Sequence, residues 1–222
     1  MVIAVAALCG CAAPQISLTK QAQAKIDRAE GILIIPQNSL EISVRRTEPG
    51  NTGAIGALIA AGIDNIRQSR AEKAAAPMYE PLRDFDFRKV MLDAANAALA
   101  RSDNVKFSVP LRTESVDSDS TRKSAYDQLT ASALLFINVG YRLEDRSLIV
   151  TAKAELYPKA EALKQFRNSA DESNPLDSGN AIYRKKLIVT KRPIRTTNIK
   201  ESLSEAATDI ALQLAVDLNK GI

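Results

Sequence analysis

The rest of the chain is organised around the sequence ALLFINVGYRLEDRSLIVTAKAELY, which runs from Ala133 to Tyr157. Apolar residues occupy every second position from 135 to 143, and the same alternation returns from 148 to 156 after a short polar break. Because side chains two residues apart lie on the same face of a strand, this pattern predicts two strands, each with one buried face. The polar break predicts the turn of an antiparallel hairpin. The opposite face of the second strand is expected to face water: Thr151, Lys153 and Glu155.

Segments on both sides of the hairpin are expected to extend or cover it. Apolar alternation or short apolar runs predict strands at 32–35, 40–44, 105–109 and 182–191, and apolar residues at helical spacing predict helices at 87–100, 121–130 and 199–218. Pro77 and Pro81 are expected to break the helix before them. Asn198 and Glu201 have the spacing of a capping box at the start of the last helix. The sequence therefore predicts an α+β (mixed α/β) fold, with a central, largely antiparallel sheet covered by helices.

Composition limits the classes of function. The chain has 222 residues, of which 45% are hydrophobic and only 5% aromatic, which fits one domain with appendages and a core of small residues. A net charge of +4 alone is too weak to indicate nucleic acid, so we expect no nucleic-acid partner. There is no histidine, and both cysteines lie in the first eleven residues. We therefore expect no cofactor, no metal and no cysteine nucleophile.

The amino-terminal sequence MVIAVAALCGC joins a short apolar run to the two cysteines. The run is too short for a transmembrane helix, which needs about 20 residues. Residues 8–11, LCGC, resemble the bacterial lipobox, and the resemblance implies cleavage before Cys11, diacylglycerol on its sulfur and an acylated amino terminus. Ala12 is similar to the residue that follows the cysteine in lipoproteins sorted to the outer membrane. We expect a lipid anchor at the periplasmic face of the outer membrane, with an ordinary secretory signal as the alternative.

The expected domain organisation follows from this amino terminus. Residues 1–10 are expected to be a signal peptide, although no Lys or Arg precedes the apolar run, which indicates a start codon upstream. Residues 11–30 are expected to be the lipidated cysteine and a polar tether, partly helical from Lys20. Residues 31–222 are expected to form a single α+β periplasmic domain.

A segment rich in small residues, GAIGALIAAGIDNIRQSRAEK, occupies 53–73. Small residues at helical spacing let helix backbones approach closely, and the set here is Gly53, Gly56, Ala57, Ala60 and Ala61. As a helix, 53–63 would span only about 16 Å, against roughly 30 Å of hydrocarbon. We expect this helix to pack closely within the protein or against another subunit, and contact with the membrane is the alternative.

Basic residues gather around the last predicted strand: Arg184, Lys185, Lys186, Lys191, Arg192 and Arg195. One interpretation is a binding surface for an acidic partner, such as anionic lipid headgroups or an acidic protein face. The other is an edge strand that lysines protect from pairing with other chains. The sequence alone leaves both open.

The element order, with the LLFINV strand, the hairpin and the terminal helix, resembles a sheet-and-helix domain of known envelope proteins. That domain is shared by the curli-secretion lipoproteins, the lipoprotein activators of penicillin-binding proteins and the amino-terminal domain of the Tol translocation protein. The segments GAIGALIAAGI and LRDFDF also look like those of uncharacterised bacterial lipoproteins. The first resemblance covers 32–218 and rests on element order, so no functional residue is carried over from it.

Enzyme motifs are weak in this sequence. Ser120 and Lys123 match the S-x-x-K pattern of penicillin-interacting serine enzymes, but the K-T-G element is missing and the pattern also occurs at 17–20. We expect a non-enzymatic, lipid-anchored interaction module of the cell envelope, with an unidentified protein partner. The alternatives are a subunit of an oligomeric outer-membrane secretion structure, which would be a homo-oligomer, and a hydrolase of envelope polymers.

Overall fold

The computed structural model describes residues 14–37, 39–43, 53–144, 146–169 and 173–222, with the backbone alone for 53–63. The elements are α1 (Lys20–Gln23), β1 (Ala29–Ile34), β2 (Glu41–Ser43), α2 (Gly53–Leu82), α3 (Phe87–Leu99), β3 (Arg112–Glu114), α4 (Asp119–Asp127), β4 (Ala133–Glu144), β5 (Ser147–Pro158), α5 (Glu161–Lys164), the 3-10 turn η1 (Ser178–Asn180), β6 (Tyr183–Lys191) and α6 (Ile199–Lys220). Cys11 lies outside the described part, and so does the packing of Gly53, Gly56, Ala57, Ala60 and Ala61, so the expectations about them stay predictions.

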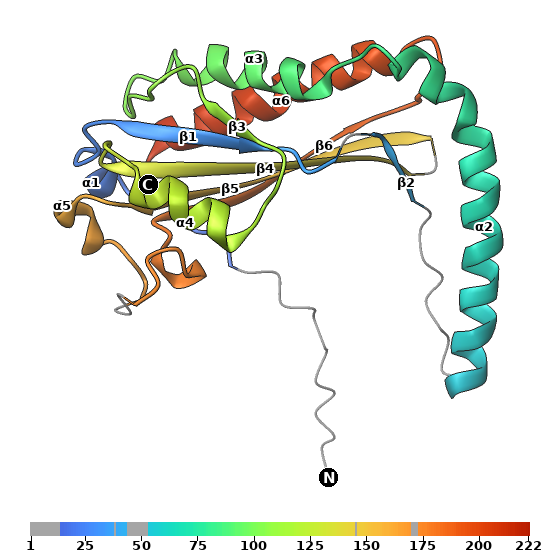
Figure 1. The fold of residues 1–222 in the computed structure, drawn as a ribbon, viewed down its shortest axis with the longest axis horizontal. Helices are drawn as coiled ribbons and strands as arrows, with labels where there is room; N and C mark the ends of the chain where they lie inside the picture. Colours follow the sequence, from blue (N-terminus) through green and yellow to red (C-terminus); the bar gives the residue numbers. More distant parts are fainter. Residues whose placement is uncertain (1–13, 38, 44–52, 145, 170–172) are drawn as a thin grey trace.

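The predicted hairpin is the centre of one mixed sheet. Its strands run in the order β3-β1-β4-β5-β6, and β2 pairs with β4 beyond the end of β1 (Figure 1). The longest ladders are the antiparallel pairs β4–β5 and β5–β6, whereas β1 pairs in parallel with both β3 and β4. The α+β fold predicted from the sequence is confirmed, and so is the antiparallel hairpin, whose ladder closes at Glu144 and Ser147.

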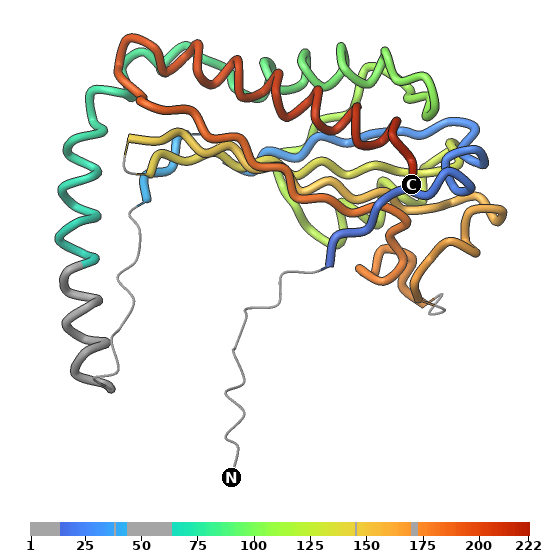
Figure 2. Tube along the Cα trace, turned by 180° about the vertical axis from the view of Figure 1, so that it is seen from behind, coloured from blue at the N-terminus to red at the C-terminus, as the bar shows by residue number. Residues whose placement is uncertain are grey.

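Helices cover the two faces of the sheet unequally. α3 and α6 lie side by side along one face, where Leu135, Ile137 and Val139 of β4 are fully buried (Figures 1 and 2). Their burial results from the alternation read in the sequence. The opposite face is covered only in part, by α4 and the segment 173–180, over a smaller cluster that contains Phe136 and Tyr157. This partly covered face carries the site described below.

α2 does not end where the prolines led us to expect. The helix passes through Pro77 and Pro81, so the prediction that they break it is wrong. A proline removes one backbone hydrogen bond from a helix, a local cost that contacts elsewhere can offset. Here Gln68 Nε2 donates to the Ile42 carbonyl at 2.8 Å, and Tyr79 Oη donates to the Leu40 carbonyl at 3.3 Å. These contacts hold the helix to the domain on both sides of Pro77.

Two further expectations are corrected. The strand predicted at 105–109 forms later in the chain, as β3. Its ladder with β1 begins where Arg112 pairs with Ile32, and the predicted range contributes only a single bridge, at Phe107. The capping box at the start of α6 is not formed. The Asn198 amide group instead accepts from the Arg195 N–H at 2.7 Å and donates to the Pro193 carbonyl, which fixes the turn before the helix.

The described part of the expected tether belongs to the domain. Ile16 and Arg184 exchange two backbone hydrogen bonds, of 2.8 and 2.7 Å, and Leu18, Ala22 and Ile26 are buried. Their four-residue spacing is the apolar pattern of a helix face, and it accounts for the packing of this segment on the domain. None of the described helices is both long enough and apolar enough to cross a membrane.

Candidate functional site

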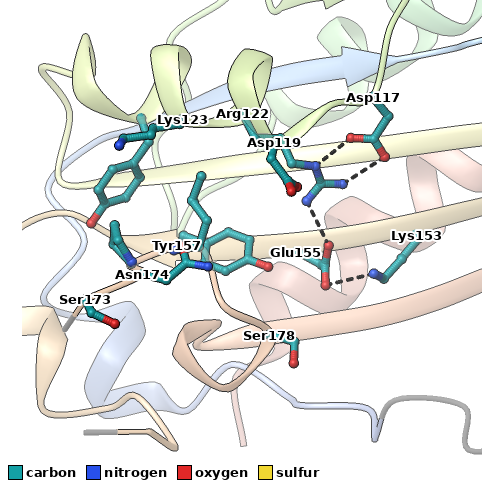
Figure 3. A pocket seen from close by; sticks show the side chains of 13 residues that line it. Asp117, Asp119, Arg122, Lys123, Lys153, Glu155, Tyr157, Ser173, Asn174 and Ser178 are labelled. Carbon is teal, nitrogen blue, oxygen red and sulfur yellow. Dashed lines mark hydrogen bonds and ion pairs between the residues drawn. The ribbon is translucent and has the colours of Figure 1, made fainter. Parts of the chain in front are cut away.

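A pocket of about 540 Å³ opens on the partly covered face of the sheet (Figure 3). Its walls come from α4, from β5 and from the segment 173–178. The sequence places residues there by simple geometry, because alternate residues of β5 point to this face. These are Lys153, Glu155 and Tyr157, and α4 contributes Arg122 and Lys123 from above.

Glu155 is the buried centre of the site. Its side chain is 2% exposed, so the expectation that it faces water is wrong. Its carboxylate lies 3.0 Å from Arg184 Nε, 3.0 Å from Lys153 Nζ and 3.2 Å from Arg122 Nη1. Sheet register supplies one of these contacts directly, since Arg184 on β6 stands opposite Glu155 on β5. A buried carboxylate needs such partners to offset the loss of its water.

Arg122 is the second fixed charge. Its Nε and Nη2 lie 2.6 and 3.1 Å from the two oxygens of Asp117, a bidentate contact. Asn138 also donates to Asp117, and the Arg122 guanidinium lies 4.7 Å from the centre of the Phe136 ring. Arg122 therefore joins Asp117 to Glu155 and is held from several sides, as the dashed lines of Figure 3 show.

α4 is positioned by its own ends. Ser118 precedes the helix, and its hydroxyl accepts from the Thr121 N–H at 3.2 Å, a standard amino-terminal cap. Near the other end, Tyr126 Oη donates to the Pro158 carbonyl at 2.6 Å and fastens the helix to the end of β5. These contacts fix α4 over the sheet and so place Arg122 above Glu155.

The pKa directions show the protonation state of the site. Hydrogen bonding from Arg122 lowers the pKa of Asp117, against the effect of its burial. Burial raises the pKa of Glu155, but the hydrogen bonds and charges of Lys153 and Arg122 outweigh this, so its pKa lies below the ordinary value. Burial and the charge of Glu155 raise the pKa of Tyr157 to about 12. At neutral pH both carboxylates are therefore ionised and Tyr157 is protonated.

The arrangement suits binding better than proton transfer. A general acid or base works best with a pKa near the working pH, and these three groups are shifted away from neutrality. Lys123 and Asp119 both line the pocket, are exposed, and form no ion pair with any residue that the structure describes. The pocket therefore offers a cation and a carboxylate at its mouth above a fixed network of charges.

The enzyme and metal patterns gain no support from the site. Ser120 of the S-x-x-K match lies on α4, and its hydroxyl is 3.0 Å from that of Ser118, another serine rather than a base. Within the described ranges, no three potential metal ligands of the His, Cys, Asp and Glu types come together.

The six basic residues predicted as a partner surface do not act as one group. Arg184 is buried in the pocket network, so it does not belong to an exposed surface. Lys185 lies 3.5 Å from Asp217, and Lys191 lies 2.8 Å from Asp209 and 3.1 Å from Glu205, all on α6. The members that remain exposed are Lys186, Arg192 and Arg195.

Sequence reasoning did not identify Asp117, Arg122 or Glu155 as site residues. A signal was present, because Glu155 and Arg184 carry opposite charges on strands that were both predicted. Only the register between those strands shows that the two residues are neighbours. Asp117 and Arg122 carry no such signal, since a loop and a short helix bring them to the sheet.

Comparison with known proteins gives weak likenesses. No protein-family model matches the chain, and no curated protein matches its sequence. Among solved structures it is similar to protein XCC0632 of Xanthomonas campestris, described as DUF330, with 12% identity over 86% of this chain and 84% of that one and a TM-score of 0.36. A PelC dodecamer from Paraburkholderia phytofirmans shows 12% identity over 88% and 92%, with a TM-score of 0.28. The LpoB C-terminal domain from Salmonella enterica shows 11% identity over 79% and 96%, with a TM-score of 0.22. At these values the likenesses assign the chain to no family.

Proposed function

We propose that this protein is a non-catalytic binding module of the bacterial cell envelope, anchored to the outer membrane through Cys11, whose pocket under α4 receives an acidic group of its partner. The observation that carries the proposal is the fixed charge network around Glu155, with Lys123 exposed and unpaired among the described residues beside it. The lipobox resemblance of residues 8–11 supplies the envelope location.

The network supports binding because its charges are already held in place. Ordering a flexible side chain at an interface costs roughly 0.5–1.5 kcal/mol. Arg122 and Arg184 are fixed by their carboxylates before any partner arrives, so little of that cost remains for them. A partner then meets a surface whose shape and charge pattern are formed in advance.

The charge at the mouth of the pocket favours an acidic partner. Lys123 is exposed, and the side chain of Lys153 is half exposed while its ammonium contacts Glu155. Glu155 is buried, the side chain of Asp117 is 26% exposed, and both carboxylates are paired with arginines. A carboxylate or phosphate that approaches the mouth is therefore attracted by the lysines, while the charges of Asp117 and Glu155 are offset by their arginines.

Photo-crosslinking in living cells tests this function. A photoreactive amino acid at Lys123 is expected to form a covalent adduct with an envelope component, and Lys153→Glu in the same chain is expected to weaken it. The matched control is the same amino acid at Leu212, which is 48% exposed on α6 at the other face of the sheet. The proposal fails if position 123 gives no adduct, or if position 212 gives the same one. If the adduct persists unchanged in Cys11→Ser, the part of the proposal that concerns the lipid anchor fails, because the contact would then not require the anchor.

A further inference from the structure

A second pocket, of about 520 Å³, lies between α2 and the end of the sheet, and it shares no residue with the pocket under α4. We call it the α2 pocket. In Figure 1, α2 stands beside the end of the sheet at which β2 and the turn between β4 and β5 lie. The helix forms one wall, and β2, this turn and the loop 193–196 form the other. The volume falls within the roughly 300–1,000 Å³ of small-molecule sites.

The interior of the α2 pocket is apolar on both sides. On the helix, the lining residues follow the spacing of a single helix face: Ala71, Ala74, Ala75 and Met78. One turn earlier, Gln68 holds the helix to the Ile42 carbonyl at 2.8 Å. Because alanine carries only a methyl group, the space beyond this contact is left open. Leu143 and Ile194 line the opposite side and are 5% and 2% exposed.

The charged residues that line the α2 pocket are two arginines, Arg146 and Arg195, and none of its lining residues is acidic. Both are exposed, and neither guanidinium forms an ion pair or a hydrogen bond with any residue that the structure describes. The Ile194 N–H donates to the Arg146 carbonyl at 3.0 Å, which brings the two arginines to the same rim. In the pocket under α4, by contrast, Arg122 is already paired with two carboxylates.

The backbone holds both arginines in defined positions. The Asn198 side chain accepts from the Arg195 N–H at 2.7 Å and donates to the Pro193 carbonyl. Arg146 has a φ of 62°, a left-handed conformation that glycine and asparagine adopt more readily than arginine. The turn itself would therefore favour another residue, and Arg146 contributes through its side chain.

We propose that the α2 pocket binds a lipid with a phosphate headgroup, with the phosphate at Arg146 and Arg195 and one acyl chain between α2 and the sheet. Arginine suits phosphate because its guanidinium forms paired hydrogen bonds with phosphate oxygens. An acyl chain suits the walls because burial of apolar surface favours binding. An acidic peptide fits less well, since its backbone N–H and carbonyl groups would lie between apolar walls without partners.

This inference goes beyond the proposed function and does not rest on it, because the two pockets have separate residues. Crosslinking at Lys123 tests the pocket under α4, and the titration below tests the α2 pocket. Either proposal can therefore fail while the other stands.

Calorimetric titration with dodecyl phosphate, below its micelle concentration, tests the lipid site. The protein is the full chain with Cys11→Ser, so that no lipid of its own competes. Saturable binding is expected. Inorganic phosphate carries only the charge and dodecyl maltoside only the chain, so each is expected to bind at least about tenfold more weakly, the loss of one charged hydrogen bond or of a few buried methylene groups.

Variants of the rim locate the phosphate. Arg195→Gln is expected to weaken the binding of dodecyl phosphate by about tenfold or more. The matched control is Lys186→Gln, which removes the same charge from an exposed residue outside both pockets and is expected to bind like the wild type. Arg146→Gly separates binding from folding. Glycine accepts the φ of this position, so the melting temperature should be kept or raised while binding falls by about tenfold.

Four outcomes overturn the lipid site. Dodecyl phosphate does not bind, or one of the two partial probes binds as tightly as it does. Lys186→Gln weakens binding as much as Arg195→Gln, which would show attraction by net charge alone. Arg146→Gly folds and binds dodecyl phosphate like the wild type, which would remove the headgroup contact from this rim.

Discussion

Glu155 and Arg184 stand opposite each other on β5 and β6, with 3.0 Å between carboxylate and guanidinium, and their side chains are 2% and 5% exposed. Burying two charges costs several kcal/mol of hydration free energy for each ion, which their mutual attraction offsets only with further partners. Lys153 and Arg122 supply these to Glu155, and the Ser178 carbonyl accepts from Arg184. The pair is therefore part of a network that joins α4, two strands and the segment 173–178.

Removing one member of this network is expected to leave uncompensated charge. Glu155→Gln leaves Arg184 buried without its carboxylate, and we expect a loss of about 3–5 kcal/mol in the free energy of unfolding. The control is Lys153→Gln, because the Lys153 side chain is 50% exposed. Its ion pair should contribute less than about 1 kcal/mol. Denaturant unfolding measures both, and equal losses would contradict a buried network centred on Glu155.

The network also predicts how stability depends on pH. Asp117 and Glu155 have pKa values below their ordinary 3.8 and 4.5 in the folded protein. Between the folded and the unfolded pKa, the unfolded chain binds more protons, so these carboxylates stabilise the fold above their ordinary values and lose this effect as pH falls through the folded pKa. Urea unfolding from about pH 7 to about pH 3 should show this loss at the acid end. Glu155→Gln should flatten the curve there, and an unchanged slope would show that Glu155 is not the responsible group.

Leu214 tests the packing of α6. It is fully buried against the sheet, so Leu214→Ala should cost roughly 2–5 kcal/mol. Leu212 lies two residues away on the same helix and is 48% exposed, so Leu212→Ala should stay within about 0.5 kcal/mol of wild type. Thermal melting compares the two variants. The docking of α6 would be in doubt if they melted alike.

Cys11 tests the anchor expected from residues 8–11. Cys11→Ser should release the protein from the membrane fraction or leave an uncleaved precursor, because serine cannot carry the thioether-linked lipid. Cys9→Ser is the control and should remain membrane-bound. Fractionation with immunoblotting measures both variants, and a processed Cys11→Ser protein that stays in the outer membrane would refute the lipobox interpretation.

The parts of the fold that the sequence predicts are those with local periodicity. The hairpin of 133–157 and the apolar stripe of α6 were predicted because each repeats over many residues. The continuation of α2 through Pro77 was not predicted. It depends on contacts that Gln68 makes with β2 and that Tyr79 makes with the residue just before β2. Local preference yields to such tertiary contacts.

The site was less predictable than the fold. The alternation in a strand shows which residues share a face, but it does not show whether another element covers that face. For this reason the sequence predicted that the Glu155 side chain faces solvent. The cover is α4 and the segment 173–178, and their placement depends on non-local contacts such as Tyr126 with Pro158. For the same reason Arg184 was grouped with surface lysines although its partner lies on the neighbouring strand.

The hydrogen bonds between Ile16 and Arg184 set how far the domain can stand from a membrane. If Cys11 carries the lipid, five residue steps separate it from Ile16, a reach of about 17 Å even when fully extended. The domain would then sit directly on the lipid headgroups, with the Arg184 end of β6 nearest to them. It could not search the space beyond, so a partner would have to bring its acidic group down to the membrane surface. With so short a tether, the protein would bind partners only at the membrane surface.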